Sequence, residues 1–345
     1  MKYCIVLLIG FLCIASLHIG GIVSWVVPVL AFGIIPIIEL WLPPNSQNLD
    51  PIQEKQVQNN SWYDFILYAA FLLHYAVVFS FFFTLPSFSQ ISLGELLGRI
   101  FTFGISCGVL GINVAHELGH RSKKSEKLMA ALLLLTSLYM HFKIEHNRGH
   151  HQWVGTPQDP STARLGETIY AFWLRTIIGT YLLAWQLELA RLKKKGISFW
   201  SLQNEMLLNT LAQLLWLISI FYWGGIYLGI CYLLGATIGI LLLESVNYIE
   251  HYGLTRKEIA PGHYEKILPK HSWNSDHPLG RILLFELSRH SDHHYNAARK
   301  YPILRHHPNS PQMPTGYPGM IMLALLPPLW FKIMHPKILE WQNSL

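Results

Sequence analysis

The chain has 345 residues, of which 51% are hydrophobic and only 13% are charged. A soluble enzyme carries about twice that share of charged residues, so this composition indicates an integral membrane protein. The formal charge is +6, but the basic residues form no stripe interleaved with polar recognition residues, which argues against nucleic-acid binding. The four cysteines lie in apolar runs without a C-x-x-C pair, so we expect neither disulfides nor a cysteine metal site.

Six apolar segments are predicted to cross the bilayer, which takes about 20 residues per helix. They are residues 3–21, 22–42, 62–85, 93–115, 206–222 and 226–249. Tight turns are expected at Gly20-Gly21, around Pro86 and at Gly224-Gly225. The first two segments together are too long for the apolar core of a signal peptide, so we expect them to be retained as membrane helices.

Three further apolar segments are not expected to cross. Residues 128–142 are flanked by lysines and are too short, and a crossing there would place neighbouring histidine-rich segments on opposite faces of the membrane. Residues 166–195 mix aromatic and charged side chains, which is typical of an amphipathic helix on the membrane surface. Residues 320–331 contain Pro327-Pro328, which makes a spanning helix unfavourable.

The basic residues are distributed as this topology requires. Twelve of the 26 Lys and Arg lie in residues 121–195 and eleven in 256–337, whereas the three predicted outer turns contain none. The positive-inside rule therefore places both termini and the segments 116–200 and 250–345 in the cytoplasm, on the inner membrane. Arg99, near the outer end of the fourth crossing, is the one exception. We predict a single all-α membrane domain of six transmembrane helices with a cytoplasmic, histidine-rich cap.

Nine histidines in this cap form four groups. H-E-L-G-H and E-H-N-R-G-H-H each contain histidines four residues apart, which on a helix lie on one face. N-Y-I-E-H-Y-G and L-S-R-H-S-D-H-H supply the other groups. The nine are His116, His120, His146, His150, His151, His251, His290, His293 and His294. Since one zinc ion takes about four ligands, nine imidazoles predict a dimetal site with five and four ligands or a similar division. Imidazole suits Zn, Cu, Fe and Ni alike.

Four acidic residues beside these histidines are predicted to hold them by hydrogen bonds, as carboxylates commonly do around metals. They are Glu117, Glu145, Glu250 and Asp292. Asp159, Asn247 and Asn274 are weaker candidates for the same role. The alternative for each carboxylate is a solvated charge at a helix end. Isolated histidines are expected to be interfacial or core residues; they are His18, His74 and His335.

A strip of glycines leads along the fourth crossing towards His116. It consists of Gly104, Gly108 and Gly111. Such a strip favours close helix–helix contact of the small-x-x-x-small kind. The alternative is a slot that admits a linear substrate.

The four histidine segments resemble the signature motifs of the membrane-bound alkane hydroxylase (alkane monooxygenase) family, within the fatty acid desaturase/hydroxylase superfamily. The likeness extends to T-P-Q-D-P-S-T-A-R at 156–164 and H-S-W-N-S-D-H at 271–277. It implies a non-haem diiron enzyme that uses dioxygen to hydroxylate the terminal carbon of an alkane or alkyl chain to a primary alcohol, with the nine histidines as iron ligands. The departures are Arg121 where Lys is usual, Ser288 where Gln is common and Tyr295 where Ala is frequent; none removes a ligand.

Electrons for such a reaction must come from outside the chain, which has no G-x-G-x-x-G fingerprint and no cysteine cluster. The resemblance implies a rubredoxin-type donor served by an NAD(P)H-dependent reductase. We expect it to dock on basic residues. The candidates are Arg148, Lys193, Lys194, Lys195, Arg299, Lys300 and Arg305. Membrane lipids and a hydrophobic substrate are the other expected partners, with no nucleic acid.

Three alternatives remain open at this stage. A fatty-acyl desaturase or hydroxylase, or a hydroxylase of aromatic methyl groups, would share the scaffold and the metals. An intramembrane zinc protease would use His116, Glu117, His120 and one further histidine as third ligand but would leave six histidines unexplained. A metal transporter or store would need polar residues within the crossings, which contain almost none.

Overall fold

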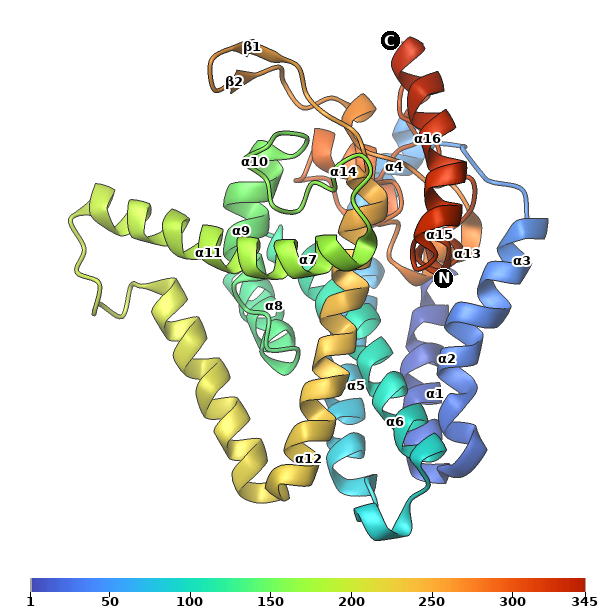
Figure 1. The fold of residues 1–345 in the computed structure, drawn as a ribbon, viewed down its shortest axis with the longest axis vertical. Coiled ribbons are helices and arrows are strands. Elements are labelled where there is room, and N and C mark those ends of the chain that lie inside the picture. Colours follow the sequence, from blue (N-terminus) through green and yellow to red (C-terminus); the bar gives the residue numbers. More distant parts are fainter. Residues whose placement is uncertain (1, 345) are drawn as a thin grey trace. The chain divides into compact units, whose positions relative to one another are not determined.

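The computed structural model describes residues 2–344, and most of these residues lie in helices (Figure 1). Within these residues, five helices are long and apolar enough to cross a membrane. They are Lys2–Ile19, Gly21–Trp41, Trp62–Thr84, Leu93–Gly119 and Glu205–His251. The last, α12, contains a non-helical residue at Gly225, with φ 68°, which divides it into two arms. All six predicted apolar segments are therefore helical, and the all-α membrane fold is confirmed.

The boundaries of these helices agree with the turn signals in the sequence. The first helix ends at Ile19, and both Gly20 (φ 71°) and Gly21 (φ 55°) adopt left-handed conformations that glycine tolerates. The elements of the crossing-length helices are η1 (Lys2–Cys4), α1 (Ile5–Ile19), η2 (Gly21–Trp25), α2 (Val26–Val29), η3 (Leu30–Ile34), α3 (Ile35–Trp41), α5 (Trp62–Thr84), α6 (Leu93–Ser106), η5 (Cys107–Ile112), α7 (Asn113–Gly119) and α12 (Glu205–His251). Here η3 and η5 are π-helical turns within longer helices.

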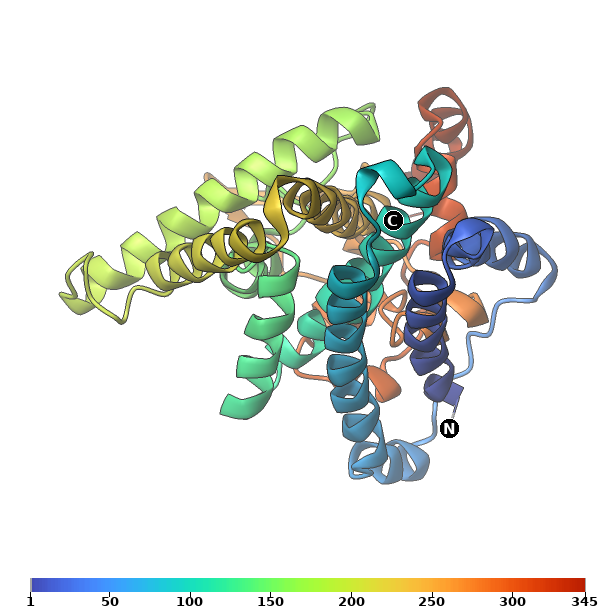
Figure 2. The ribbon, with the colours of Figure 1, turned by 90° about the horizontal axis from the view of Figure 1, so that it is seen from below.

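The chain divides into two compact units. The first comprises Met1–Gly33, Asn60–Glu145 and Tyr181–Leu243. At its centre α1 contacts α5 and α6, and Figure 2 shows α1 and α5 side by side in a view along the bundle. The short helices of this unit are η4 (Phe88–Gln90), α8 (Lys124–Thr136) and α9 (Phe142–Glu145). With only 13 residues, α8 is too short to span a bilayer, as expected.

The glycine strip of the fourth crossing is a helix contact. A Cβ atom on Gly104 would lie 2.5 Å from the side chain of Ile238 in α12, and one on Gly239 would lie 2.5 Å from that of Cys107. A Cβ on Gly108 would lie 3.1 Å from Leu242. Because these positions are already filled by the facing helix, they support close helix packing and argue against a substrate slot.

Arg99, the exception in the charge count, is buried in the first unit. Its guanidinium donates to Glu95 Oε1 (2.8 Å) and to the backbone carbonyls of Leu17 (2.5 Å) and Thr84 (3.0 Å). These carbonyls belong to the last turns of α1 and α5, which have no helical N–H partners of their own. Arg99 therefore caps two helices and is paired with a carboxylate, so it contributes no free charge.

The second unit comprises Ile34–Asn59, His146–Thr180 and Glu244–Leu345. Its elements are α3, α4 (Pro51–Gln58), η6 (His146–His150), α10 (His151–Trp153), η7 (Pro269–His271), α13 (Pro278–Leu283), α14 (His290–Tyr295), η8 (Tyr301–Ile303), α15 (Tyr317–Ala324) and α16 (Pro327–Asn343). Two short strands, β1 (Glu258–Ala260) and β2 (His263–Tyr264), pair antiparallel as a hairpin.

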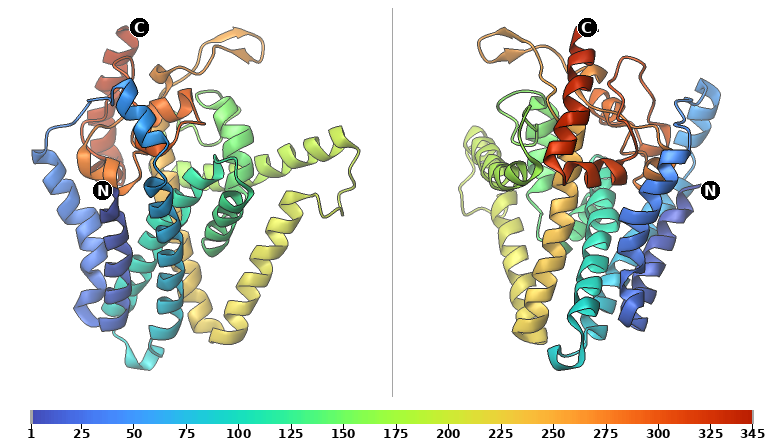
Figure 3. Two further views of the ribbon diagram at one scale, coloured as in Figure 1. Left: turned by 180° about the vertical axis from the view of Figure 1, so that it is seen from behind. Right: turned by 45° about the vertical axis from the view of Figure 1, so that its right-hand side comes forward.

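Two further predictions about apolar segments can be compared with this structure. Residues 166–195 contain one long helix, α11 (Ile169–Lys195), as expected. Residues 320–331 do not form one straight helix, because α15 and α16 meet at an angle of 120° (Figure 3). The bend falls just before Pro327-Pro328, where the missing N–H groups prevent the helix from continuing.

Candidate metal centre

The first histidine pair lies at the end of a helix in the first unit. His116 is in α7 (Asn113–Gly119), and His120 is the residue that ends this helix. Their ring centroids are 5.0 Å apart, as expected for residues four apart on one helical face. The structure thus brings this pair together as the sequence predicts.

The second histidine group lies on a π-helical turn, η6 (His146–His150), and not on a regular α-helix. His146 and His151, five residues apart, approach each other with 3.0 Å between their Nε2 atoms. His150 faces a different set of histidines. The rings of His146 and His150 are stacked with their centroids 5.3 Å apart, so the two lie side by side as expected, but their nitrogens belong to different histidine sets.

Four buried histidines of the second unit converge from three segments. Their candidate ligand atoms lie within 4.8 Å of one another. They are His150 from η6, His251 from the end of α12, and His290 and His294 from α14. The Nε2 atoms of His150 and His294 are 3.1 Å apart, and so are those of His251 and His290. We call these residues the four-histidine set.

Three other histidines of the same unit form a second group, the three-histidine set. It consists of His146, His151 and His293. His151 Nε2 lies 3.0 Å from His146 Nε2 and 3.1 Å from His293 Nε2. A single proton on His151 Nε2 can serve only one of these contacts, whereas a cation between the three nitrogens would serve all of them.

The distances between nitrogens fit metal binding. Two imidazole nitrogens bound at about 2.1 Å and at right angles to each other are about 3.0 Å apart, whereas a tetrahedral ion would separate them by about 3.4 Å. The closest nitrogen pairs in both sets are 3.0–3.1 Å apart, and all candidate ligand atoms of a set lie within 4.8 Å of one another. Burial and the four neighbouring imidazoles lower the pKa of His294 well below its usual value, which keeps it in the neutral, metal-binding form.

Asp159 contacts His150 of the four-histidine set at the ring nitrogen that faces away from the other histidines. Its Oδ2 lies 2.9 Å from His150 Nδ1 and accepts from Thr162 Oγ1 at 2.6 Å, and its Oδ1 accepts the Ser161 N–H. Burial by itself would raise the pKa of Asp159, but the charge and hydrogen bond of His150 lower it below its usual value. An ionised Asp159 fixes the proton of His150 on Nδ1 and leaves Nε2 free to bind a metal.

The loop that carries Asp159 is itself held by α11. Arg175 donates to the carbonyls of Pro160 (2.9 Å) and Thr162 (3.1 Å) and makes two 2.7 Å contacts with the carboxylate of Glu167. The weaker sequence candidate Asp159 is therefore a direct neighbour of a predicted ligand. Its nine-residue distance from His150 gave no sign of this.

Glu250 contacts the four-histidine set at a ring nitrogen that also faces another histidine of the set. Its Oε2 is 3.2 Å from His290 Nε2, and its Oε1 accepts a 2.7 Å hydrogen bond from the hydroxyl of Tyr317. Both side chains are buried. Sequence reasoning missed Tyr317, which lies 67 residues from Glu250 and in no histidine motif.

The other predicted polar residues have different neighbours. Asp292 binds Arg299 (2.6 Å), His307 Nε2 (2.7 Å) and the backbone N–H of Arg305 (2.9 Å). These partners lower its pKa, although burial alone would raise it. Glu145 is buried in the first unit. Among the weaker candidates, Asn247 donates to Glu244 (3.0 Å), and Asn274 accepts from Ser291 (3.0 Å).

Glu117, the acid of the H-E-L-G-H motif, is engaged in an ion pair. Arg121 contacts its Oε1 through Nη2 at 2.7 Å and through Nε at 3.0 Å. A zinc protease would need this carboxylate to act as a general base towards water. A carboxylate held by a guanidinium is a poor base, which argues against the protease alternative.

The H-S-W-N-S-D-H segment joins the third and fourth histidine groups. The Trp273 N–H donates to the carbonyl of Glu250 (2.8 Å), and the Ser275 N–H donates to that of Ser288 (2.8 Å). Each contact lies next to a histidine of the four-histidine set. This explains structurally why residues 271–277 accompany the histidine motifs.

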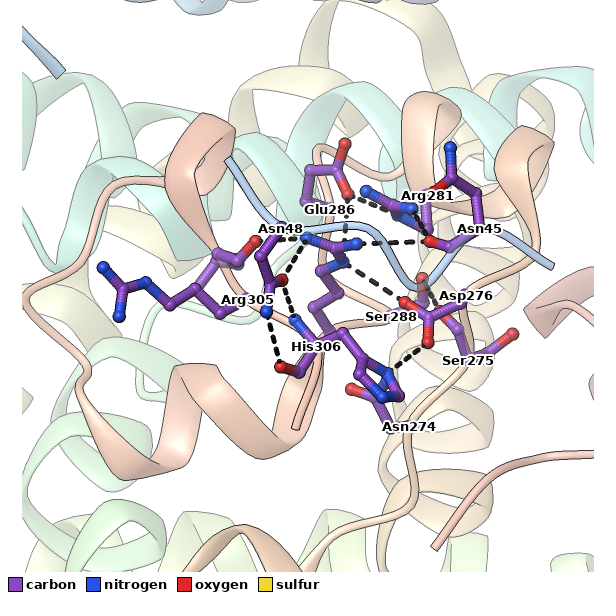
Figure 4. A network of polar contacts seen from close by, with 12 residues as sticks. Asn45, Asn48, Asn274, Ser275, Asp276, Arg281, Glu286, Ser288, Arg305 and His306 are labelled. Atoms are coloured by element: carbon purple, nitrogen blue, oxygen red, sulfur yellow. Dashed lines mark hydrogen bonds and ion pairs between the residues drawn. The ribbon is translucent and has the colours of Figure 1, made fainter. Parts of the chain in front are cut away.

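A polar network fixes the residues that precede His290 (Figure 4). Arg289 is buried and contacts Asp276 Oδ1 (3.3 Å), the carbonyl of Gln47 (2.9 Å) and the carbonyl of Leu304 (2.7 Å). His306 contacts the other oxygen of Asp276 at 2.6 Å. The network ties the segment between α3 and α4 to the start of α14, and so restrains the helix that carries three of the histidines.

Together, the fold and the site define an α-helical membrane protein with a histidine-rich metal centre. A family model described as fatty acid desaturase matches residues 91–324. The chain is 46% identical to alkane 1-monooxygenase 1 of Pseudomonas aeruginosa over 243 residues, which are 70% of this chain and 63% of that relative, just under two thirds.

Two further relatives extend the comparison. Alkane 1-monooxygenase 2 of the same organism is 40% identical over 319 residues, 91% of this chain and 84% of the relative. The hydroxylase component of a xylene/toluene monooxygenase from Pseudomonas putida is 33% identical over 252 residues, 72% and 66% of the two chains. The chain belongs to the fatty acid desaturase family and, within it, to the alkane 1-monooxygenases. It is therefore an enzyme of the oxidoreductase class.

Proposed function

We propose that this protein is a non-haem diiron monooxygenase that hydroxylates the terminal carbon of alkanes or alkyl chains to primary alcohols. One atom of dioxygen enters the C–H bond and the other leaves as water, which consumes two electrons and two protons. The observation that carries the proposal is the convergence of imidazole nitrogens in two adjacent sets within the second unit. The names of the alkane 1-monooxygenase relatives supply the substrate class.

The nine histidines are assigned to two irons. The four-histidine set would hold one iron, and the three-histidine set, completed by His116 and His120, would hold the other. This gives four and five ligands, the division expected from the number of imidazoles. In support, the helix end of α7 presents two adjacent imidazoles, and the nitrogens of His146 and His293 lie 3.0 and 3.1 Å from Nε2 of His151. When bound, the irons would supply the dioxygen chemistry.

The surrounding residues are proposed to orient the ligands. Asp159 fixes the tautomer of His150. Glu250, held by Tyr317, lies beside Nε2 of His290 and would add a carboxylate next to that ligand nitrogen. We retain Glu117, Glu145 and Asp292 as supporting carboxylates, with Glu117 acting through Arg121 and Asp292 through Arg299 and His307. The predominantly apolar helices would bring the substrate from the lipid.

The proposal includes the membrane location and the electron donor. We infer one membrane domain in the inner membrane, with both termini, the metal site and segments 116–200 and 250–345 in the cytoplasm, as the basic residues indicate. A rubredoxin-type donor with its NAD(P)H-dependent reductase would dock on basic residues there. Lys193, Lys194 and Lys195 are exposed, whereas Arg299 and Arg305 are engaged with Asp292 and Glu54.

Purification into nanodiscs provides the test. We expect about two irons per chain and conversion of n-octane to 1-octanol with ¹⁸O₂, one label entering the alcohol, when rubredoxin, its reductase and NADH are supplied. One tightly bound zinc, or iron without oxygenation of any alkane or methylarene, would contradict the proposal. Oxidation of xylene in preference to octane would instead favour the aromatic-methyl hydroxylase, as the xylene/toluene relative allows.

A further inference from the structure

A polar side chain without a polar partner lies one helical turn before the first histidine pair. Asn113 is the first residue of α7 and is only 8% exposed. Among residues 2–344, no group accepts a hydrogen bond from its Nδ2. An amide left in this state costs free energy, and polar side chains within membrane-spanning helices commonly mark functional sites.

Two other buried polar side chains of the same long helix do have partners. Thr102 Oγ1 donates to the backbone carbonyl of Ser24 at 2.8 Å. Ser106 Oγ lies 2.9 Å from His74 Nδ1. Hydrogen bonds between packed helices account for these residues. Nothing in the described part of the chain accounts for the amide of Asn113 in this way, so the amide has the capacity to bind a ligand.

Asn113 lies between the apolar part of this helix and a predicted metal ligand. Residues three apart on an α-helix are neighbours, so Asn113 shares a face with His116. Helical side chains lean towards the N-terminus, which brings the imidazole of His116 over the turn that contains Asn113. The preceding residues, C-G-V-L-G-I at 107–112, offer no strongly polar side chain. They form the π-helical turn η5, an irregularity that is frequent at functional sites.

We propose that Asn113 binds the hydroxyl group of the primary alcohol product. This deepens the proposed function and rests on it, in that the product is taken to be a primary alcohol. A hydroxyl group is both a donor and an acceptor, and so is a primary amide. The Nδ2–H group can donate to the hydroxyl oxygen while Oδ1 accepts the hydroxyl hydrogen. An alkane offers neither group, so Asn113 distinguishes the product from the substrate.

The position of the amide suits an amphiphilic molecule. A newly formed hydroxyl group lies beside the metal ligands, and the rest of the molecule is an alkyl chain. The amide of Asn113 is one turn from His116, and the apolar residues 107–112 precede it. The hydroxyl group therefore meets the amide where the alkyl chain meets apolar side chains.

A ligand-binding role and a structural role predict opposite changes in stability. Asn113→Leu replaces the amide by an apolar side chain of similar size. Because Nδ2 has no partner among the described residues, we expect the thermal midpoint of the metal-free protein to be unchanged or higher. Thr102→Val is the matched control, 11 residues earlier or about 16 Å along an α-helix. It removes the donor to Ser24 and should lower the midpoint.

The binding experiment uses radiolabelled 1-octanol and n-octane with the metal-free protein in nanodiscs. Empty nanodiscs serve as the blank for partition into lipid. Asn113→Leu should weaken 1-octanol binding about 3- to 10-fold, the range expected for one hydrogen bond, and leave n-octane binding unchanged. Thr102→Val should bind both molecules as the wild type does. In the iron-loaded enzyme, the inhibition constant of 1-octanol should rise by the same factor in Asn113→Leu.

Equal binding of 1-octanol by the wild type and Asn113→Leu would overturn the proposal. Weaker binding of both molecules would also overturn it, because Asn113 would then affect packing without recognising a hydroxyl group. Asn113→Ala, which removes the amide without adding bulk, gives the same test if leucine prevents folding. A wild type that binds 1-octanol through Asn113 but forms no alcohol from n-octane would contradict the proposed function and still support the hydroxyl site.

Discussion

The two histidine sets of the second unit differ in their burial and in the carboxylates that contact them. In the four-histidine set all four residues are buried, and two carboxylates, Asp159 and Glu250, contact its members. The three-histidine set includes the half-buried His151. A buried set with its own carboxylates is a preformed site, whereas a set in which one imidazole, that of His151, is only half-buried is the more accessible one. The comparison predicts that the four-histidine set retains its metal, whereas the three-histidine set gives access to the metal.

Removing a ligand from the four-histidine set should have the largest effect. We expect His251→Ala to lower alkane turnover at least about 100-fold and to remove about one iron per chain, because the ion loses a quarter of its imidazoles in a closed site. Iron analysis and product formation by the purified variant provide the measurement. The buried His74, which is bound by Ser106 and Thr136 and belongs to neither histidine set, is the matched control. Retention of two irons in His251→Ala would show that this set is not a metal site.

Asp159→Asn should have the next largest effect. The amide cannot supply the charge that orients His150, so we expect metal affinity at this set to fall about 10- to 100-fold. Competition with a coloured chelator measures this affinity. Thr162→Val, which removes only a donor to Asp159, should cause a smaller loss. If both variants bind metal as the wild type does, Asp159 supports the loop and not the ligand.

Tyr317→Phe tests whether the hydroxyl of Tyr317 supports the carboxyl of Glu250. Loss of the hydroxyl that donates to Oε1 of this buried carboxyl should cost about 1–3 kcal/mol of stability, because Oε1 loses that hydrogen bond. Denaturant unfolding of the metal-free protein would show the loss. If turnover falls several-fold while stability is unchanged, Glu250 acts on the reaction and its support is not structural.

The smallest effect is expected at Glu167, which pairs with Arg175, the residue that holds the loop carrying Asp159. Burial would raise the pKa of Glu167, but the hydrogen bond from Arg175 lowers it, so its folded value is below the unfolded value of about 4.3. Its stabilisation is therefore present above about pH 4.3 and is lost as the pH falls through the folded pKa. We expect Glu167→Gln to lose about 0.5–1 kcal/mol at pH 7, since Arg175 is partly exposed. The difference from the wild type in thermal melts should shrink as the pH is lowered below about 4.3; a constant difference would exclude the ion pair as its cause.

The sequence predicted the helices well because length and apolarity determine them locally. The six apolar segments and both glycine turns needed no knowledge of distant contacts. The site was harder. Whether η6 forms an α or a π turn depends on the surroundings of the histidines, so the pairing of His146 with His151 could not be deduced from spacing. Tyr317, at the start of α15, contacts Glu250 from 67 residues away, and the contact of Asp159 with His150 depends on the path of the loop that carries Asp159, so neither contact follows from separation along the chain.

The glycine contact between the fourth crossing and α12 has a consequence for engineering. Gly104 and Gly239 meet the facing helix with no room for a methyl group. Mutagenesis at these positions would push the two helices apart before it changed the shape of any substrate path. Attempts to alter the range of substrates should therefore leave this strip intact and vary larger apolar residues elsewhere, where a change of volume can be absorbed by side chains.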